Sequence, residues 1–177
     1  MESPTNDKIE TPPGEETLEQ QDSLFQPVKH FLLLCLLSFG SYLFFWFYKH
    51  WRYLKDEKEM DISPGFRSLL IVFTGYSLFR DFKKLAAAEG YKTKAPYGIL
   101  FLLLCLVFIS IRVEDISPLF FLIAPLSFTL LVPAVVMMNF YYLHAHPHHR
   151  IRKKLGIDEI VFLLAVWVIL LLAGFSS

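Results

Sequence analysis

Four of the six histidines in this 177-residue chain lie within a six-residue segment that is followed by arginine. They are His144, His146, His148 and His149, and Arg150 comes next. Neutral imidazole nitrogens bind Zn²⁺, Ni²⁺ or Cu²⁺, and imidazoles gain charge as the pH falls below about 6.5. Two kinds of chemistry are therefore available to the segment, a divalent metal site and a pH-dependent surface.

A proline inside the segment favours a third interpretation, the end of a membrane helix. Pro147 cannot continue an α-helix and holds His146 in an extended conformation. No cysteine or carboxylate lies at close ligand spacing, since Asp158 is ten residues beyond His148. The cations that follow are suited to anionic lipid headgroups, and they are Arg150, Arg152, Lys153 and Lys154. We therefore interpret the segment as a solvated loop at the membrane surface, with the other two as alternatives.

The segment follows one of several apolar blocks that could cross a membrane. Hydrophobic residues make up 54% of the chain, above the share in soluble domains, and they are concentrated in uncharged runs. The predicted spans are about 31–48, 97–111, 118–143 and 160–175. The first corresponds to about 27 Å of helix, close to the thickness of the hydrocarbon core.

A further apolar block, residues 68–79, is too short to cross a bilayer comfortably. If it crosses, two loops with five lysines and arginines each lie on opposite faces, against the positive-inside rule. If it enters and leaves on one side, fourteen of the 17 lysines and arginines lie inside. We therefore expect an all-α integral membrane protein with four transmembrane helices, one interfacial or re-entrant helix at about 64–82, and both termini outside. Five transmembrane helices are the alternative.

The first 28 residues differ in composition from the rest of the chain. They contain seven acidic residues, one lysine and Pro12-Pro13-Gly14, with few apolar side chains. Such a segment cannot bury enough surface to fold, so we expect disorder over 1–28 and a polytopic helical membrane domain over 29–177. Because no signal-peptide pattern is present, the first span is expected to be an uncleaved anchor.

Aromatic and basic residues are expected to mark the inner face of the membrane. Tryptophan and tyrosine are enriched at membrane–water interfaces. The predicted belt consists of Trp46, Tyr48, Trp51, Tyr141 and Tyr142. We expect Lys83 and Lys84 to contact lipid headgroups together with the cations of residues 150–154.

Three motifs carry a resemblance to a known family. They are Trp-Phe-Tyr-Lys-His-Trp at 46–51, Ile-Ser-Pro-Gly-Phe-Arg-Ser at 62–68, and Tyr-Ser-Leu-Phe at 76–79. Residues 44–82 resemble a family of small, uncharacterised bacterial membrane proteins that carry a domain of unknown function. The resemblance implies a multi-pass protein of the bacterial inner membrane and implies no activity. The histidine cluster is not part of the family's pattern.

The predicted spans contain none of the groups that usually mark catalysis or ion coupling in a membrane. They have no Asp, Glu, Lys, Arg or His, and the chain has no nucleophile motif or phosphate-binding glycine loop. We therefore expect no enzymatic activity and no cofactor. The expected role is that of an interaction, scaffold or modulator component of a membrane assembly. Expected partners are anionic lipids and either another protein or a second copy of the chain, and not nucleic acid.

Two other functions are consistent with the sequence. Asp-Ile-Ser-Pro occurs at 61–64 and again at 115–118, as it would in a structural repeat, and this favours a small transporter or lipid translocator. The second alternative is a metal- or pH-responsive membrane module that uses the four clustered histidines.

Overall fold

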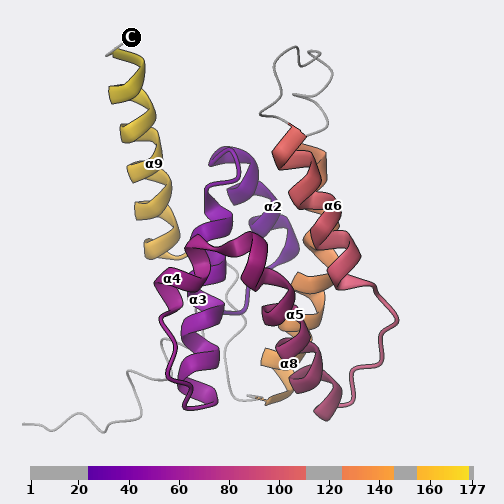
Figure 1. Cartoon of the computed structure of the whole chain (residues 1–177). Helices are drawn as coiled ribbons and strands as arrows, with labels where there is room; N and C mark the ends of the chain where they lie inside the picture. The colour runs from indigo at the N-terminus through magenta and orange to yellow at the C-terminus, as the bar shows by residue number, and fades with distance from the viewer. Residues whose placement is uncertain (1–23, 111–124, 146–154, 176–177) are drawn as a thin grey trace, which may run out of the picture.

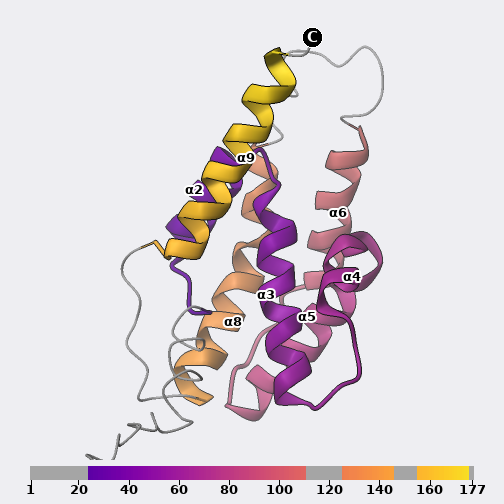
Figure 2. The same cartoon turned by 90° about the vertical axis from the view of Figure 1, so that its left-hand side faces the viewer.

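The computed structural model describes residues 24–110, 125–145 and 155–175 of the chain (Figure 1, Figure 2). Every regular element in these residues is a helix, as the sequence predicts. The helices are α2 (Val28–Leu37), α3 (Tyr42–Glu57), α4 (Pro64–Leu69), α5 (Ile71–Ala88), α6 (Tyr97–Ser110), the 3₁₀ helix η1 (Phe128–Leu131), α8 (Val132–Ala145) and α9 (Ile157–Phe175).

The first apolar block forms a helical hairpin, and the prediction of one span over 31–48 is wrong. α2 ends at Leu37 and α3 begins at Tyr42. Between them Phe39 and Gly40 take left-handed backbone angles, with φ of 51° and 85°, which an α-helix cannot accommodate. The Gly40 N–H donates to the Cys35 carbonyl at 2.8 Å and closes the end of α2.

The two helices of this hairpin pack through aromatic rings. The ring centroid of Phe31 on α2 lies 5.2 Å from that of Trp46 on α3, and both side chains are buried. Ser38 lies fully buried at the turn, where its Oγ accepts a hydrogen bond from the Tyr42 N–H at 2.9 Å. The hairpin is therefore a packed unit with a satisfied turn.

The second apolar block is divided between α4 and α5, and the residues that precede and follow it lie close together. Pro64 begins α4, as the Ser-Pro pair predicts, and α5 extends to Ala88, beyond the predicted end at residue 82. Lys58 precedes the block and Asp81 follows it, yet Lys58 Nζ lies 3.8 Å from Asp81 Oδ1. The two flanks of the block are thus neighbours in space.

An aromatic core joins α3, α5, α6 and α8. α3 places apolar or aromatic residues at helical spacing on one face, and these contact Phe79 and Phe82 of α5, Phe101 of α6 and Tyr142 of α8. Apolar residues at this spacing form one continuous face of the helix, which can be buried against neighbouring helices. The core therefore contains many of the rings that the sequence assigned to the membrane surface.

Four of the five residues predicted to form the interfacial belt are buried inside the protein. Trp46, Trp51, Tyr141 and Tyr142 are 2%, 0%, 3% and 5% exposed, because each packs inside the helical bundle. Only Tyr48, at 37%, presents a substantial part of its ring to the surroundings. An aromatic run at the end of an apolar block is typical of a membrane interface and also of a protein core. Here the packing of α3 against α5 and α8 buries the run.

Within the described residues, one helix is long and apolar enough to cross a membrane, the 21-residue run Pro125–Ala145 that contains η1 and α8. Its 3₁₀ segment lies between Pro125 and Pro133, each of which lacks a backbone N–H donor. Its last described residue is Ala145, two positions before Pro147. Val28–Leu37 and Tyr97–Ser110 are shorter apolar helices.

α9 lies at the outside of the bundle beside the α2–α3 hairpin, with the ring centroids of Phe39 and Trp167 6.1 Å apart (Figure 2). It begins at Ile157 with Asp158 and Glu159 in its first turn, where acidic residues stabilise a helix N-terminus. Most of its large apolar side chains are exposed. These are Ile160, Val161, Leu164, Trp167, Val168, Ile169, Leu170, Leu171 and Leu172.

Candidate functional site

Four polar side chains from distant parts of the chain meet inside the protein, and we name this cluster the polar junction. It consists of Gln26, Tyr42, Asn139 and Glu159. Gln26 Nε2 donates to Tyr42 Oη at 2.7 Å and to Glu159 Oε1 at 3.2 Å. The Tyr42 hydroxyl donates to the same carboxylate oxygen at 3.0 Å. Gln26 and Glu159 are only 5% and 6% exposed.

Asn139 fixes the backbone that carries Gln26. Its Oδ1 accepts from the Gln26 N–H at 3.2 Å, and its Nδ2 donates to the Gln26 carbonyl at 2.7 Å. The second carboxylate oxygen of Glu159 accepts from the Gly156 N–H at 3.0 Å, as in a capping box at the start of α9. The junction therefore joins the segment before α2, the start of α3, the middle of α8 and the first turn of α9.

A lysine lies at the edge of the junction. Lys49 Nζ forms an ion pair with Asp158 at 2.8 Å and lies 3.9 Å from Glu159 Oε1. The Lys49 side chain is 12% exposed and that of Asp158 is 41% exposed, so this pair is partly open to the surroundings. The carboxylate of Glu159 thus has three hydrogen-bond donors and one nearby ammonium group to balance its charge.

The first apolar block consequently begins and ends at the same place. Gln26 precedes the α2–α3 hairpin and reaches Glu159, while Lys49 follows the hairpin's apolar part and reaches Asp158. Both acidic residues belong to the first turn of α9. Both ends of the hairpin therefore lie beside the first turn of α9.

Sequence reasoning missed this junction for two reasons. It placed Gln26 in the disordered tail, which is wrong for its last residues, since Leu24 and Gln26 are buried and α2 begins at Val28. The hydrogen bonds of Gln26 with Asn139 and with Glu159 join residues 113 and 133 positions apart, and no local pattern signals such pairs. Residues 1–23 lie outside the described part of the chain.

A second titratable group that the sequence did not single out is His50. It is 3% exposed, its Nδ1 lies 2.7 Å from the Trp46 carbonyl oxygen, and its ring contacts Trp46, Phe82 and Tyr142. Burial lowers the pKa of His50 from 6.5 to about 3, and the neighbouring charge of Lys49 acts in the same direction. The signal was present, because His50 follows Trp46 by four residues on the apolar face of α3.

The histidine segment of the sequence analysis is described only at its first residue. His144 is exposed near the end of α8, where its ring stacks on Phe140 at 3.8 Å and its Nδ1 lies 2.9 Å from the Phe140 carbonyl. His146, His148, His149, Arg150, Arg152, Lys153 and Lys154 lie outside the described residues, so their roles stay predictions. Within residues 24–110, 125–145 and 155–175, no three His, Cys, Asp or Glu side chains lie close enough to hold a metal ion.

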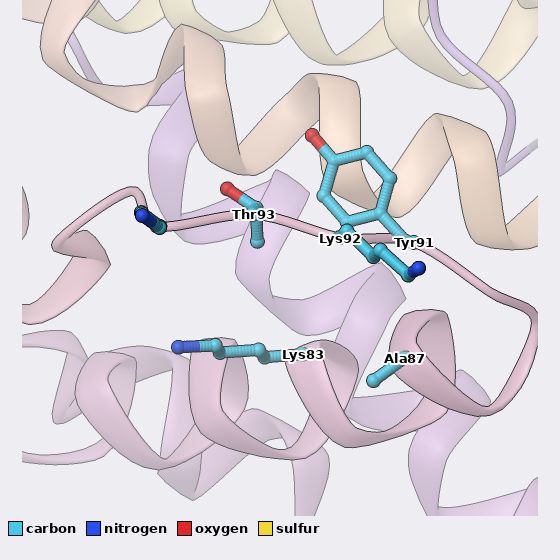
Figure 3. A pocket seen from close by; sticks show the side chains of 6 residues that line it. Lys83, Ala87, Tyr91, Lys92 and Thr93 are labelled. Carbon is cyan, nitrogen blue, oxygen red and sulfur yellow. The ribbon is translucent and has the colours of Figure 1, made fainter.

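A hollow of about 440 Å³ lies beside the last turns of α5 (Figure 3). Lys83, one of the predicted headgroup-binding residues, lines it, whereas its exposed neighbour Lys84 does not. The complete lining is Lys83, Ala87, Tyr91, Lys92, Thr93 and Lys94.

Comparison of the chain with protein-family models, with curated proteins and with solved structures found no match.

Proposed function

We propose that this chain is an integral membrane protein that crosses the bilayer three times and acts as an interaction or scaffold component of a membrane assembly. The observation that carries the proposal is the return of the first apolar block to the first turn of α9, through Gln26 and Lys49. This arrangement replaces the four crossings expected from the sequence.

The exposed apolar surface supports a membrane setting. α6 and α9 direct large apolar side chains outward along most of their lengths, which water would penalise and lipid would not. The 19 residues of α9 correspond to about 28 Å of helix, close to the hydrocarbon thickness. The run Pro125–Ala145 is the one described helix that is both long and apolar enough to cross a membrane.

The two remaining apolar blocks are better suited to entering the membrane than to crossing it. The α2–α3 hairpin has both ends at Asp158 and Glu159, and the α4–α5 segment has flanks joined by Lys58 and Asp81. Non-helical backbone is tolerated at membrane depth only where it is packed against protein or lines a cavity. The turn at residues 38–41 meets this condition at Ser38, which is fully buried.

The distribution of positive charge supports the three-crossing arrangement. Three crossings, by α6, by Pro125–Ala145 and by α9, leave only residues 111–124 and the C-terminal end on the outer side. Every one of the 17 lysines and arginines except Arg112 then lies on the inner side. The positive-inside rule favours this arrangement over the four-crossing one, in which three of these residues lie outside. The N-terminus would lie inside and the C-terminus outside, in a bacterial inner membrane if the family resemblance holds.

Cysteine labelling tests this topology. In a Cys35→Ala/Cys105→Ala background, single cysteines replace Lys29, Glu57, Glu89, Asp115 and Ser177, and intact cells are treated with a membrane-impermeant maleimide. Labelling is expected at 115 and 177 only. Labelling at 29 would restore the four-crossing arrangement, and labelling at only one of 57 and 89 would restore five crossings. Recovery of the chain in the soluble fraction would refute the membrane proposal altogether.

The proposed role as an assembly component has its own test. Purification of the full chain in native-lipid discs, followed by mass spectrometry of co-isolated proteins, is expected to recover a stoichiometric partner or a second copy. Recovery of a monomer alone would contradict it.

One observation favours the alternative of a transporter or lipid translocator. Segments that enter a membrane and return often line substrate sites in transporters, and this chain has two apolar segments with that geometry. Flux of a solute or labelled lipid into vesicles that contain the purified chain, and not into empty vesicles, would establish this function instead.

A further inference from the structure

We infer that the hollow beside α5 binds the phosphate group of an anionic phospholipid through Lys83, Lys92 and Lys94. This inference rests on the proposed membrane setting. It goes beyond that proposal because it assigns one defined headgroup site, rather than a general attraction of basic residues to anionic lipids.

The charged residues that line the hollow are all lysines, although most of the lining surface is apolar. Its lining contains three lysines and, from the described part of the chain, no acidic residue. None of the three lysines forms an ion pair with another described residue, whereas Lys49 and Lys58 do. Lysine is a point-charge ligand for phosphate groups, and an ammonium group without an internal partner is available for one.

The lysines come from two elements that face each other. Lys83 lies on α5, and Lys92 and Lys94 lie on the segment that leads to α6, with Thr93 between them (Figure 3). The ends of Lys83 and Lys92 point in opposite directions in Figure 3, so Lys92 must change its side-chain conformation for one headgroup to contact both elements.

The segment that carries Lys92 and Lys94 is held at both ends. Before it, the Tyr91 N–H donates to the Ala86 carbonyl at 2.9 Å, and the Tyr91 ring packs against Phe140 with centroids 4.8 Å apart. Within it, the Thr93 hydroxyl oxygen accepts from the Ala95 N–H at 3.1 Å and from the Tyr97 hydroxyl at 3.2 Å. The backbone of Lys92 and Lys94 is therefore already ordered, so binding costs little further conformational entropy, which favours affinity.

An exposed apolar stripe favours a lipid over a free phosphate ion. α6 rises directly from the 91–96 segment (Figure 1) and leaves one face uncovered. Exposed side chains recur there at helical spacing, at Ile99, Leu102, Leu103, Leu106 and Ile109. A lipid whose phosphate contacts the three lysines could lay an acyl chain along this stripe, whereas inorganic phosphate would use the lysines alone.

Native mass spectrometry of the full chain in mild detergent tests the site, with phosphatidylglycerol and phosphatidylcholine as probes. The site variant is Lys83→Gln/Lys92→Gln/Lys94→Gln, and the matched control is Lys29→Gln/Lys55→Gln/Arg80→Gln, which removes the same charge from exposed positions elsewhere. All six side chains are exposed, so both variants are expected to fold, and circular dichroism checks this.

We expect wild-type chain to bind phosphatidylglycerol more tightly than phosphatidylcholine. The site variant should lose about fivefold in phosphatidylglycerol affinity for each lysine removed, and the control less than twofold in total. Lys83→Gln alone should weaken binding while Arg80→Gln, three residues earlier on the same helix, should not.

Two results would overturn the inference. Equal losses in the site and control variants would show a diffuse field without a site, and full displacement of phosphatidylglycerol by 10 mM inorganic phosphate would show a site for a soluble anion. In either case cysteine labelling can still support the membrane topology. Absence of the chain from membranes would instead remove the proposed function and this inference together.

Discussion

Gln26 and Glu159 share a buried hydrogen bond of 3.2 Å across 133 positions of sequence. Because Gln26 precedes the first apolar hairpin and Glu159 begins the last helix, this bond fixes where the hairpin starts relative to α9. Lys49 and Asp158 do the same for the hairpin's other end. The topology that we propose depends on these two contacts, and the first prediction tests them.

Glu159→Ala should destabilise the protein by about 1–3 kcal/mol, because it leaves the Tyr42 hydroxyl and the Gln26 amide without their acceptor inside the bundle. Asp158→Asn is the matched control, since its partly exposed ion pair contributes at most about 1 kcal/mol. The measurement is the temperature at which half of the detergent-solubilised protein loses its monodisperse chromatographic peak. A larger loss for Asp158→Asn would contradict the assignment of Glu159 as the central acceptor.

Two tyrosines of the bundle should respond differently to the loss of their hydroxyl groups. The Tyr142 hydroxyl is buried and has no hydrogen-bond partner among the described residues, so Tyr142→Phe should be neutral or stabilising by about 1 kcal/mol. Tyr42→Phe removes two hydrogen bonds of the polar junction and should cost about 1–3 kcal/mol. The same thermal assay compares the two, and a clear loss on Tyr142→Phe would reveal a partner such as an ordered water molecule.

Gly40 should tolerate a side chain less well than Gly90, although both have positive φ, 85° and 89°. A Cβ at Gly40 would lie 3.0 Å from Phe108 Cζ and 3.1 Å from Phe128 Cζ, whereas nothing lies within 4 Å of one at Gly90. Gly90→Ala should therefore cost about 1 kcal/mol of backbone strain, and Gly40→Ala about 1–3 kcal/mol more. Equal losses in thermal stability would mean that the two rings move aside freely.

His50 predicts a specific dependence of stability on pH. A histidine in the unfolded chain titrates near pH 6.5, whereas burial lowers the pKa of His50 to about 3. The unfolded state therefore binds the proton more readily, so the contribution of His50 to stability is complete above about pH 6.5 and is lost as the pH falls toward 3. His50→Gln should reduce the fall in thermal stability across this range.

The control for His50 is Phe82→Leu, which disturbs the same packing without removing a titrating group. It should lower stability by a similar amount at every pH. If His50→Gln behaved in the same way, the pH dependence would arise from other groups.

The sequence predicted the elements whose signals are local. Pro64 at the start of α4 and the acidic pair at the start of α9 each act within one helical turn, and the two helices begin there. The all-helical class followed from the uncharged apolar runs. These parts of the fold require no knowledge of distant contacts.

The hairpin and the aromatic core were missed because their causes are not local. Residues 31–48 are long enough to span a bilayer, and only two residues, Phe39 and Gly40, break the run by adopting positive φ. Glycine within an apolar helix is common, so it does not by itself predict a turn. The burial of Trp51 and Tyr142 depends likewise on α5 and α8 packing against α3, which hydropathy does not reveal.

The position of Glu159 also sets the order in which the protein can be completed. During synthesis Tyr42 emerges 117 residues before the carboxylate that accepts its hydroxyl hydrogen, and Gln26 emerges 133 residues before it. Until then both ends of the first hairpin lack their shared acceptor. The first apolar segment of the chain is consequently among the last to reach its final environment, and α9 acts as the closing element of the fold.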